Sequence, residues 1–374
     1  MSRPRVFRAL LPLLVAGPLA VACAAEPGNS ATAVSSTAST GSSSSSGSSS
    51  SEETLLRLGE PRDLATGLQA PWSIALTDAG EILLSERDTA RILQVLPDGG
   101  TRVVGTLDDV VARGEGGLLG LAVADGFLYS YATGPDGNRV TRHLLEDSPE
   151  GPVLGAEEEI LAGIPSATTH NGGRLAFGPD GMLYISTGDS SEPALAQDPE
   201  SLAGKILRVT PDGSVPEDNP FPGSPVYSLG HRNVQGLAWG ADGTFYASEF
   251  GASTWDELNI ITPGGNYGWP AAEGPGGGEG HIDPVAWWNT ADASPSGIAV
   301  TGDTVMSANL RGNVLRAVDT NDPARQQQFF GGELGRLRDV AVSPEGDLLV
   351  LTNNTDGRGN PREGDDRLLV VPVS

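Results

Sequence analysis

Short apolar runs separated by turn residues fill most of the chain, and one such pattern recurs. A typical copy holds one apolar run, an Asp-Gly or Pro-Asp-Gly turn, and a second run of alternating apolar and polar positions. Six copies begin at Trp72, Leu118, Arg174, Val234, Pro295 and Leu337. Their spacing of roughly 40 to 60 residues is typical of propeller blades and too long for helical solenoid repeats. Because alternation dominates and helical periodicity is almost missing, the pattern predicts an all-β fold.

Further strand-like runs lie between the copies. They cover residues 91–96, 140–145, 206–210, 258–262 and 314–318. Adding these runs to the two strands of each copy predicts a six-bladed β-propeller with four-stranded blades.

The third copy brings two chemically useful side chains to one end of a hairpin. Residues 174–177 form its first strand, Pro179-Asp180-Gly181 its turn, and residues 182–186 its second strand. His170 enters this hairpin at the end where Asp189 leaves it. A general base and its orienting carboxylate need this proximity.

The N-terminal part has the features of a lipoprotein leader. Residues 1–22 combine a basic start with an apolar run too short to span a bilayer, and they end in small residues before Cys23, the only cysteine. We therefore expect a signal peptide over 1–22, lipidation of Cys23 and an extracytoplasmic protein anchored to the cell membrane. Residues 23–52 are rich in Ser and predict a disordered tether. The propeller domain is then expected over 53–374.

The charge of the chain bears on its partners. Lys and Arg number 23 against 48 Asp and Glu, a net charge of −25. Such an acidic chain is repelled by nucleic acid and by anionic membrane surfaces, so neither is an expected partner beyond the lipid anchor.

Several chemically useful residues precede the repeat copies or follow them in the same register. This register gathers them on one face, around the axis. These residues are Glu115, His170, Arg232, Asn233, Arg311, Arg336 and Arg338. Planar guanidinium groups suit a ligand with several carboxylates or carbonyls, and His170 with Asp189 suits proton abstraction from a hydroxyl.

The segment after the fourth copy has the donors of a calcium site. It combines Glu249, Gly251 and Ala252, then Glu257, then the run 265–270. Carboxylates and backbone carbonyls in a Gly-rich loop are oxygen ligands that Ca²⁺ accepts. His143, His231 and His281 have no metal-ligand spacing, and we expect structural or surface roles for them.

These residues carry a resemblance to a known family. The matching motifs are Gly116-Gly117-Leu118-Leu119, His170 with Gly173-Arg174-Leu175, Gly188-Asp189, Gly230-His231-Arg232-Asn233, Asn266-Tyr267-Gly268-Trp269-Pro270 and Arg336-Leu337-Arg338-Asp339-Val340. Together they resemble the quinoprotein glucose/sorbosone dehydrogenases, soluble aldose sugar dehydrogenases. The resemblance implies a six-bladed propeller that binds pyrroloquinoline quinone (PQQ) and Ca²⁺ and oxidises the C1 hydroxyl of an aldose to a lactone.

The resemblance also implies roles for single residues. His170 would be the base, Asp189 its orienting partner, and Arg232 and Asn233 contacts to the quinone carbonyl edge. Arg336 and Arg338 would clamp the PQQ carboxylates. The carbonyls of Gly251 and Ala252 would face a catalytic Ca²⁺, whereas Glu257 and Tyr267 would belong to a second, structural Ca²⁺ site.

Three positions depart from the best-known members of that family. This chain has Glu115 where those members carry Gln, Arg311 where they carry Lys, and Ala252 where they carry Pro. A carboxylate at Glu115 beside an anionic cofactor is unfavourable unless Arg311 or Ca²⁺ offsets its charge.

Two other functions stay open at this stage. One is a Ca²⁺-dependent lactonase, which needs several carboxylates around one axial metal. The other is a non-catalytic cell-surface propeller that binds a glycan or a protein. The sequence leaves the sugar and the electron acceptor undetermined.

Overall fold

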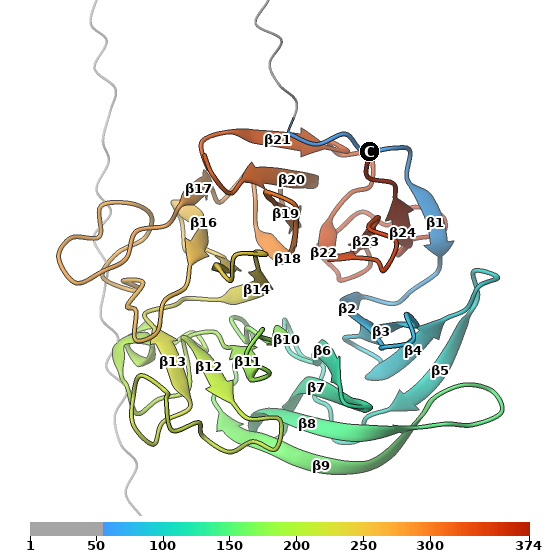
Figure 1. Cartoon of the computed structure of the whole chain (residues 1–374), viewed down its shortest axis with the longest axis horizontal. Coiled ribbons are helices and arrows are strands. Elements are labelled where there is room, and N and C mark those ends of the chain that lie inside the picture. Colours follow the sequence, from blue (N-terminus) through green and yellow to red (C-terminus); the bar gives the residue numbers. More distant parts are fainter. Residues whose placement is uncertain (1–54) are drawn as a thin grey trace, which may run out of the picture. The chain divides into compact units, whose positions relative to one another are not determined.

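Residues 55–374, which the computed structural model describes, form six four-stranded antiparallel sheets arranged around an axis (Figure 1). The prediction of an all-β, six-bladed propeller is confirmed. The expected leader, Cys23 and tether lie outside the described residues. Within residues 55–374 the fold includes no helix with the length and apolar character needed to cross a bilayer.

Five of the blades are simple meanders of consecutive strands. The first contains β2 (Pro71–Leu76), β3 (Ile82–Glu86), β4 (Arg91–Val95) and β5 (Thr101–Thr106). The second contains β6 (Leu118–Ala124), β7 (Phe127–Gly134), β8 (Gly137–Glu146) and β9 (Val153–Ile164). The third contains β10 (Leu175–Phe177), β11 (Leu183–Ser186), β12 (Lys205–Val209) and β13 (Val226–Leu229), with the 3-10 helix η1 (Pro193–Gln197) before β12.

The fourth and fifth blades follow the same order. The fourth contains β14 (Val234–Trp239), β15 (Phe245–Glu249), β16 (Trp255–Ile260) and β17 (Ala286–Asn289). The fifth contains β18 (Pro295–Thr301), β19 (Thr304–Asn309), β20 (Val314–Asp319) and β21 (Gln326–Phe329).

The sixth blade closes the ring with a strand from the start of the domain. It joins β22 (Leu337–Val342), β23 (Leu348–Thr352) and β24 (Leu368–Val371) to β1 (Arg62–Ala65). Arg62 pairs with Val370, and Leu58 forms a further bridge to Val373. The pairing covers the edge of β24 and ties both ends of the described chain together.

The apolar core lies between the blades. Buried side chains of the described residues form six clusters, each mainly at the contact of two neighbouring blades. Between the second and third blades, for example, Tyr129 and Tyr131 pack with Leu175 and Leu183. Fully burying one such side chain contributes about 1.5–3 kcal/mol. Packing of this kind fixes each sheet relative to the next.

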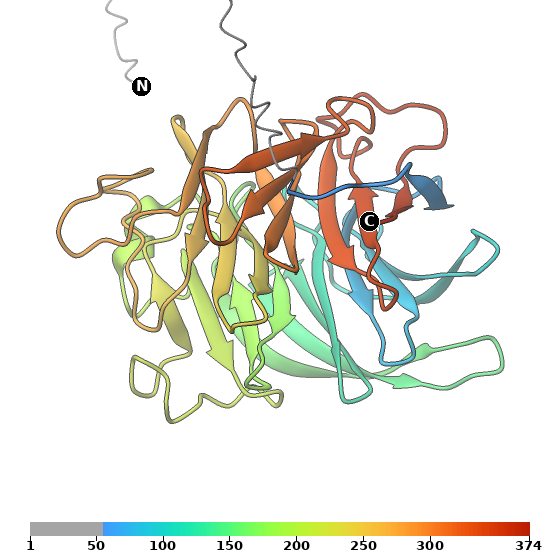
Figure 2. The same cartoon turned by 45° about the horizontal axis from the view of Figure 1, so that its top comes forward.

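The meander order sends the candidate residues to one face. In an antiparallel sheet, the start of the first strand, the end of the second and the start of the third lie at the same end. Loops before β6, β10, β14 and β22, and loops that follow β11, β15, β19 and β23, therefore gather on one side of the ring (Figure 2).

Candidate active site

Three loop segments of the third and fourth blades are joined by backbone hydrogen bonds. The amide of Asp189 donates to the Arg232 carbonyl (2.8 Å), and the amide of Ser190 donates to the His170 carbonyl (3.2 Å). Gly188 forms a bridge with Asn233. A Cβ on Gly188 would lie 2.0 Å from the His170 carbonyl oxygen, so only glycine permits this approach.

The expected pair of His170 and Asp189 is present. His170 Nδ1 lies 2.7 Å from Asp189 Oδ1, and His170 Nε2 lies 3.0 Å from Arg232 Nη2. Because a guanidinium only donates, Nε2 must be the accepting nitrogen and Nδ1 must carry the proton. The carboxylate therefore selects the tautomer whose free lone pair lies on Nε2. This is the form that a general base requires.

The Asp189 carboxylate is fully buried and held by several donors. Its Oδ2 accepts from Trp269 Nε1 (2.8 Å), and its Oδ1 accepts from the Ser191 amide (2.8 Å). Burial would raise the pKa of Asp189, but the hydrogen bonds from His170, Ser191 and Trp269 outweigh it and hold the pKa below its usual range. The carboxylate is thus anionic and fixed beside the imidazole.

Trp269 is a site residue to which the sequence analysis gave no role, although it lies in the motif 266–270. The connection between β16 and β17 passes beside the end of β13. There the backbone amide of Tyr267 donates to the Leu229 carbonyl (2.9 Å), and the backbone amide of Trp269 donates to the Gly230 carbonyl (2.9 Å). This path delivers the indole to Asp189. The Arg232 guanidinium lies 5.3 Å from the indole ring centroid.

A cavity of about 320 Å³ lies on the same face. That volume lies within the range of small-molecule sites, roughly 300–1,000 Å³. Its lining includes Trp72, Glu115 and Gln235, and five arginines: Arg87, Arg311, Arg336, Arg338 and Arg358. The structure therefore brings together the predicted residues Glu115, Arg311, Arg336 and Arg338 and adds two cations, Arg87 and Arg358.

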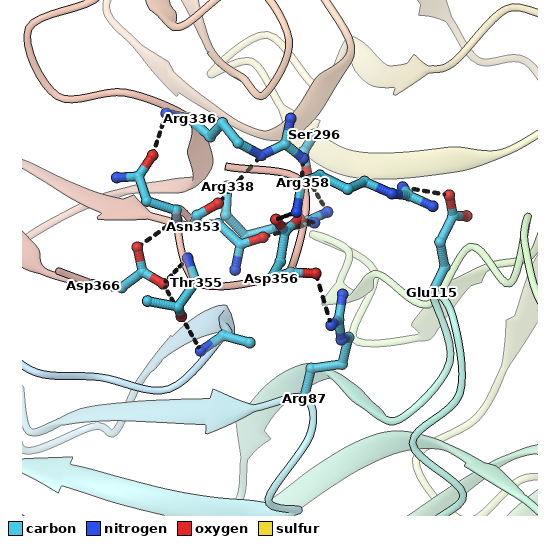
Figure 3. A network of polar contacts seen from close by, with 12 residues as sticks. Arg87, Glu115, Ser296, Arg336, Arg338, Asn353, Thr355, Asp356, Arg358 and Asp366 are labelled. Atoms are coloured by element: carbon cyan, nitrogen blue, oxygen red, sulfur yellow. Dashed lines mark hydrogen bonds and ion pairs between the residues drawn. The ribbon is translucent and has the colours of Figure 1, made fainter. Parts of the chain in front are cut away.

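The arginines differ in how firmly they are held (Figure 3). Arg336 Nη2 lies 3.0 Å from Asp356 Oδ2. Arg338 donates to Gln235 Oε1 (2.8 Å) and Asn353 Oδ1 (3.1 Å), and burial lowers its pKa to about 9. Arg311 is exposed and reaches only the Thr290 carbonyl, at 3.4 Å. Of the two offsets considered for the Glu115 charge, Arg311 does not pair with it; the cation paired with Glu115 is Arg358, at 2.7 Å.

Several buried polar atoms of these residues have no protein partner. They are Arg232 Nε, Asn233 Nδ2 and Arg338 Nε. A buried donor without an acceptor is unfavourable by about 1–3 kcal/mol, so each favours an incoming acceptor. Free donors and an excess of arginine fit a ligand with several carboxylates and carbonyls. PQQ is such a ligand.

The calcium residues form two separate groups. Glu273 Oε1 accepts from the amides of Ala252, Ser253, Thr254 and Trp255 at 2.8–3.0 Å, which shapes the loop that begins at Gly251. The Gly251 carbonyl accepts from Arg232 Nη1 at 2.6 Å. A cation on that carbonyl would therefore share the oxygen with Arg232 or displace its guanidinium.

Glu257 belongs to the second group, with Glu249 as a buried neighbour. Asn259 Nδ2 donates to both carboxylates, and Asn259 Oδ1 has no partner. Burial, and then the Glu249 charge, raise the pKa of Glu257 well above 4.5. Two buried carboxylates beside a free amide oxygen suit a hard cation.

Tyr267 does not direct its hydroxyl to Glu257, because the hydroxyl donates to the Ile260 carbonyl at 2.7 Å. Its ring instead stacks on His231, at 4.6 Å between centroids. Among residues 55–374, no three or more His, Cys, Asp or Glu side chains are arranged to hold a metal, so other oxygens, such as backbone carbonyls or Asn259 Oδ1, would have to complete either site.

Comparison of the sequence with known families shows which family this propeller belongs to. The model of the Glucose / Sorbosone dehydrogenase family matches residues 68–366. The chain belongs to this family. The match covers every strand from β2 to β23 and all the candidate site loops.

Two relatives of the chain are dehydrogenases by name. Quinoprotein glucose dehydrogenase B of Acinetobacter calcoaceticus is 35% identical over 254 residues, which are 56% of this chain and 52% of that protein. The match thus spans about half the length of that relative. An aldose sugar dehydrogenase of Escherichia coli is 28% identical over 78% of this chain and 89% of its own.

A solved structure of higher identity is a PQQ-bound aldose sugar dehydrogenase from Streptomyces coelicolor. It is 51% identical, covers 84% of this chain and 97% of its own, and has a TM-score of 0.81.

Proposed function

We propose that this protein is a PQQ-dependent dehydrogenase that oxidises the C1 hydroxyl of an aldose, or a similar alcohol, to a lactone. The observation that carries the proposal is the His170–Asp189 hydrogen bond of 2.7 Å on the same propeller face as a cavity lined by five arginines. The PQQ-bound relative with 51% identity supports the choice of cofactor. The oxidation of an aldose rests on the names of the relatives.

Bound PQQ would supply a quinone that accepts the hydride from the sugar. Arg336 and Arg338, with Arg87 and Arg311 beside them, would hold its carboxylates. Arg232 and Asn233 would donate to its carbonyl edge through the atoms that lack partners in the protein. These residues anchor and orient the group, whereas the proton is handled by His170.

The proton path follows from the tautomer. The sugar hydroxyl takes the place of Arg232 Nη2 at His170 Nε2 and donates its proton to that nitrogen. The imidazolium that results is stabilised by the buried Asp189 carboxylate. Trp269 keeps the second carboxylate oxygen occupied, so Asp189 stays in the plane needed by Nδ1–H.

We further propose Ca²⁺ at both oxygen-rich groups, with Gly251 and Ala252 in one and Glu257 in the other, where Tyr267 would have to contribute its backbone carbonyl because its hydroxyl is bound to Ile260. Support comes from the two buried carboxylates Glu249 and Glu257 and from the free Asn259 oxygen. Lipidation of Cys23 and an extracytoplasmic location are likewise proposals from the sequence. Mass spectrometry of the mature N-terminus tests them.

Reconstitution tests the enzyme function. The purified domain is mixed with PQQ and Ca²⁺, and dye reduction is followed with a panel of aldoses and simple alcohols. Saturable PQQ binding and sugar-dependent dye reduction are expected. Saturable binding of a glycan without any PQQ binding or turnover would favour the non-catalytic propeller, and lactone hydrolysis without quinone would favour the lactonase.

A further inference from the structure

An ion pair joins two distant loops across the cavity. Glu115 precedes β6 and Arg358 lies between β23 and β24, 243 residues further along the chain. Arg358 Nη1 lies 2.7 Å from Glu115 Oε1, and both residues line the cavity (Figure 3). The Glu115 side chain is 15% exposed and that of Arg358 is 52% exposed. The sequence gave no signal for Arg358, since nothing local relates the two positions.

The second carboxylate oxygen of Glu115 contacts the backbone of His170, the proposed base. Glu115 Oε2 accepts from the backbone amide of His170 at 2.8 Å. His170 has φ +60, a left-handed backbone that is unfavourable for a residue other than glycine by about 1–3 kcal/mol. Such a conformation persists only when its surroundings hold it. Glu115 is one of the contacts that do so, and it thereby sets the direction of the imidazole toward Asp189 and Arg232.

The loop that carries Arg358 is itself anchored. The Arg358 amide donates to Asp356 Oδ1 (2.9 Å), while Asp356 Oδ2 pairs with Arg336. Asp366 accepts from the amides of Asn354 and Thr355 at the base of the same loop. Arg358 is therefore presented to Glu115 from a fixed segment that also holds an arginine of the proposed cofactor clamp.

The negative charge of Glu115 requires a cation such as Arg358 beside it. Burial would raise the pKa of Glu115, but the His170 amide and the Arg358 guanidinium outweigh it and hold the pKa below its usual range. Glu115 is thus an anion in a cavity built for anions. Without Arg358 it would repel a carboxylate ligand and would be free to leave the His170 amide.

We propose that Arg358 is a positioning residue, which acts through Glu115 to fix the backbone of His170 and to neutralise the one carboxylate that the described residues bring to the cavity lining. The proposal rests on the proposed function, in which His170 is the base. A neutral Gln side chain in place of Glu115 would still accept the His170 amide proton and would not need a cation. Removal of Arg358 should therefore lower kcat, PQQ affinity and protection of the His170 amide when residue 115 is Glu, and should leave them nearly unchanged when residue 115 is Gln.

The test compares Arg358→Ala, Arg358→Lys, Glu115→Gln and the double variant Arg358→Ala/Glu115→Gln with the wild type. Arg139→Ala, which removes a surface arginine bonded to the Asp108 carbonyl, is the control. Hydrogen exchange of the His170 amide is measured first, in protein without PQQ. PQQ affinity, kcat and KM for the sugar are measured after reconstitution.

We expect Arg358→Ala to speed exchange at His170 and to lower kcat by about 10- to 100-fold, the loss of a charged hydrogen bond, with KM nearly unchanged. PQQ affinity should fall as well. Arg358→Lys, which keeps the positive charge, should lose less kcat and less PQQ affinity than Arg358→Ala. The double variant should regain kcat, PQQ affinity and amide protection to within about threefold of Glu115→Gln. Unchanged exchange and kcat in Arg358→Ala, or no rescue in the double variant, would overturn the proposal.

The exchange measurement separates this proposal from the enzyme function. If no protein oxidises a sugar but Arg358→Ala still releases the His170 amide and the added Glu115→Gln change restores its protection, the proposed function fails and the positioning role stands. If the wild type turns over and Arg358→Ala matches it in both measurements, the positioning role fails alone.

Discussion

At the scale of single residues, His170 is oriented by three contacts of different kinds. Its amide is held by Glu115, its Nδ1 by Asp189 and its Nε2 by Arg232. Only the last contact involves the lone pair that a substrate hydroxyl needs. The side chain is 19% exposed, so a substrate can reach it while the buried carboxylate behind it stays dry.

Replacing His170 tests the base directly. We expect His170→Ala to lower kcat by about 10²–10⁴-fold, the usual contribution of a general base, and to leave PQQ bound. Steady-state dye reduction and a PQQ titration measure the two effects. His281→Ala, a histidine bonded to the Gly277 carbonyl away from the cavity lining, is the control. A His170→Ala rate equal to that of the wild type would remove the residue from the mechanism.

Asp189 gives a prediction about pH. Its folded-state pKa is depressed by His170, Ser191 and Trp269, so its contribution to stability is present above the ordinary pKa of 3.8 and is lost as pH falls through the lower folded value. Asp189→Asn places an amide NH₂ against these donors and should lower the free energy of unfolding at pH 7 by about 2 kcal/mol.

Urea denaturation of the PQQ-free domain, compared between pH 7 and pH 3, measures this difference. The gap between wild type and Asp189→Asn should narrow below about pH 4, because the carboxylate of the unfolded state is protonated there and the charged folded form loses its advantage as pH falls toward the lower folded pKa. A gap of constant size across that range would show that charge has no part in holding Asp189.

At the scale of elements, the loop between β15 and β16 is shaped by one carboxylate. Glu273, from the connection between β16 and β17, collects four consecutive amides of that loop on one oxygen. The loop amides are thereby satisfied, while the Gly251 carbonyl accepts from Arg232. The loop is thus set before any cation arrives, which reduces the ordering that binding would require.

We therefore expect Glu273→Ala to weaken Ca²⁺ binding at Gly251 and Ala252 by about tenfold, since rigidity of the ligand loop sets affinity. Calorimetric titration of Ca²⁺ measures the change. Glu273→Gln keeps an acceptor oxygen for the amides and should lose less, and Glu279→Ala removes an exposed carboxylate of the same connection as a control. Equal losses of Ca²⁺ affinity in Glu273→Ala, Glu273→Gln and Glu279→Ala would mean that net charge, rather than the shape of the loop, governs Ca²⁺ binding.

At the scale of the whole propeller, the ring depends on the pairing of β1 with β24. Removing residues 55–66 from the described domain would leave β24 as an open edge. Each backbone hydrogen bond lost contributes about 1 kcal/mol, so the free energy of unfolding should fall by about 2–4 kcal/mol.

Equilibrium denaturation of residues 55–374 against residues 67–374 measures this closure. Arg62→Ala keeps the backbone of β1 and changes only an exposed side chain, so it should stay within about 0.5 kcal/mol of the parent. Equal stability of the two lengths would show that the sixth blade does not need its fourth strand.

The sequence located the inner strands well and the outer strands poorly. The six repeat copies begin within two residues of β2, β6, β10, β14, β18 and β22, because these buried strands need the same small and apolar residues in every blade. The outer strand β21 is Gln326-Gln327-Gln328-Phe329, and β9 holds three consecutive Glu, so neither shows that periodicity. Their pairing is decided by the strand beside them rather than by their own composition.

The sequence by itself determined the repeat, the blade number and the face on which His170, Asp189 and the arginines gather, because each depends on spacing along the chain. Only the tertiary structure decided which charges meet. Arg358 pairs with Glu115 and Trp269 with Asp189 through loops from different blades, and the length of such a loop does not say where its tip will lie. Packing of sheet against sheet sets those positions, and side-chain contacts between loops of different blades leave no periodic trace in the sequence.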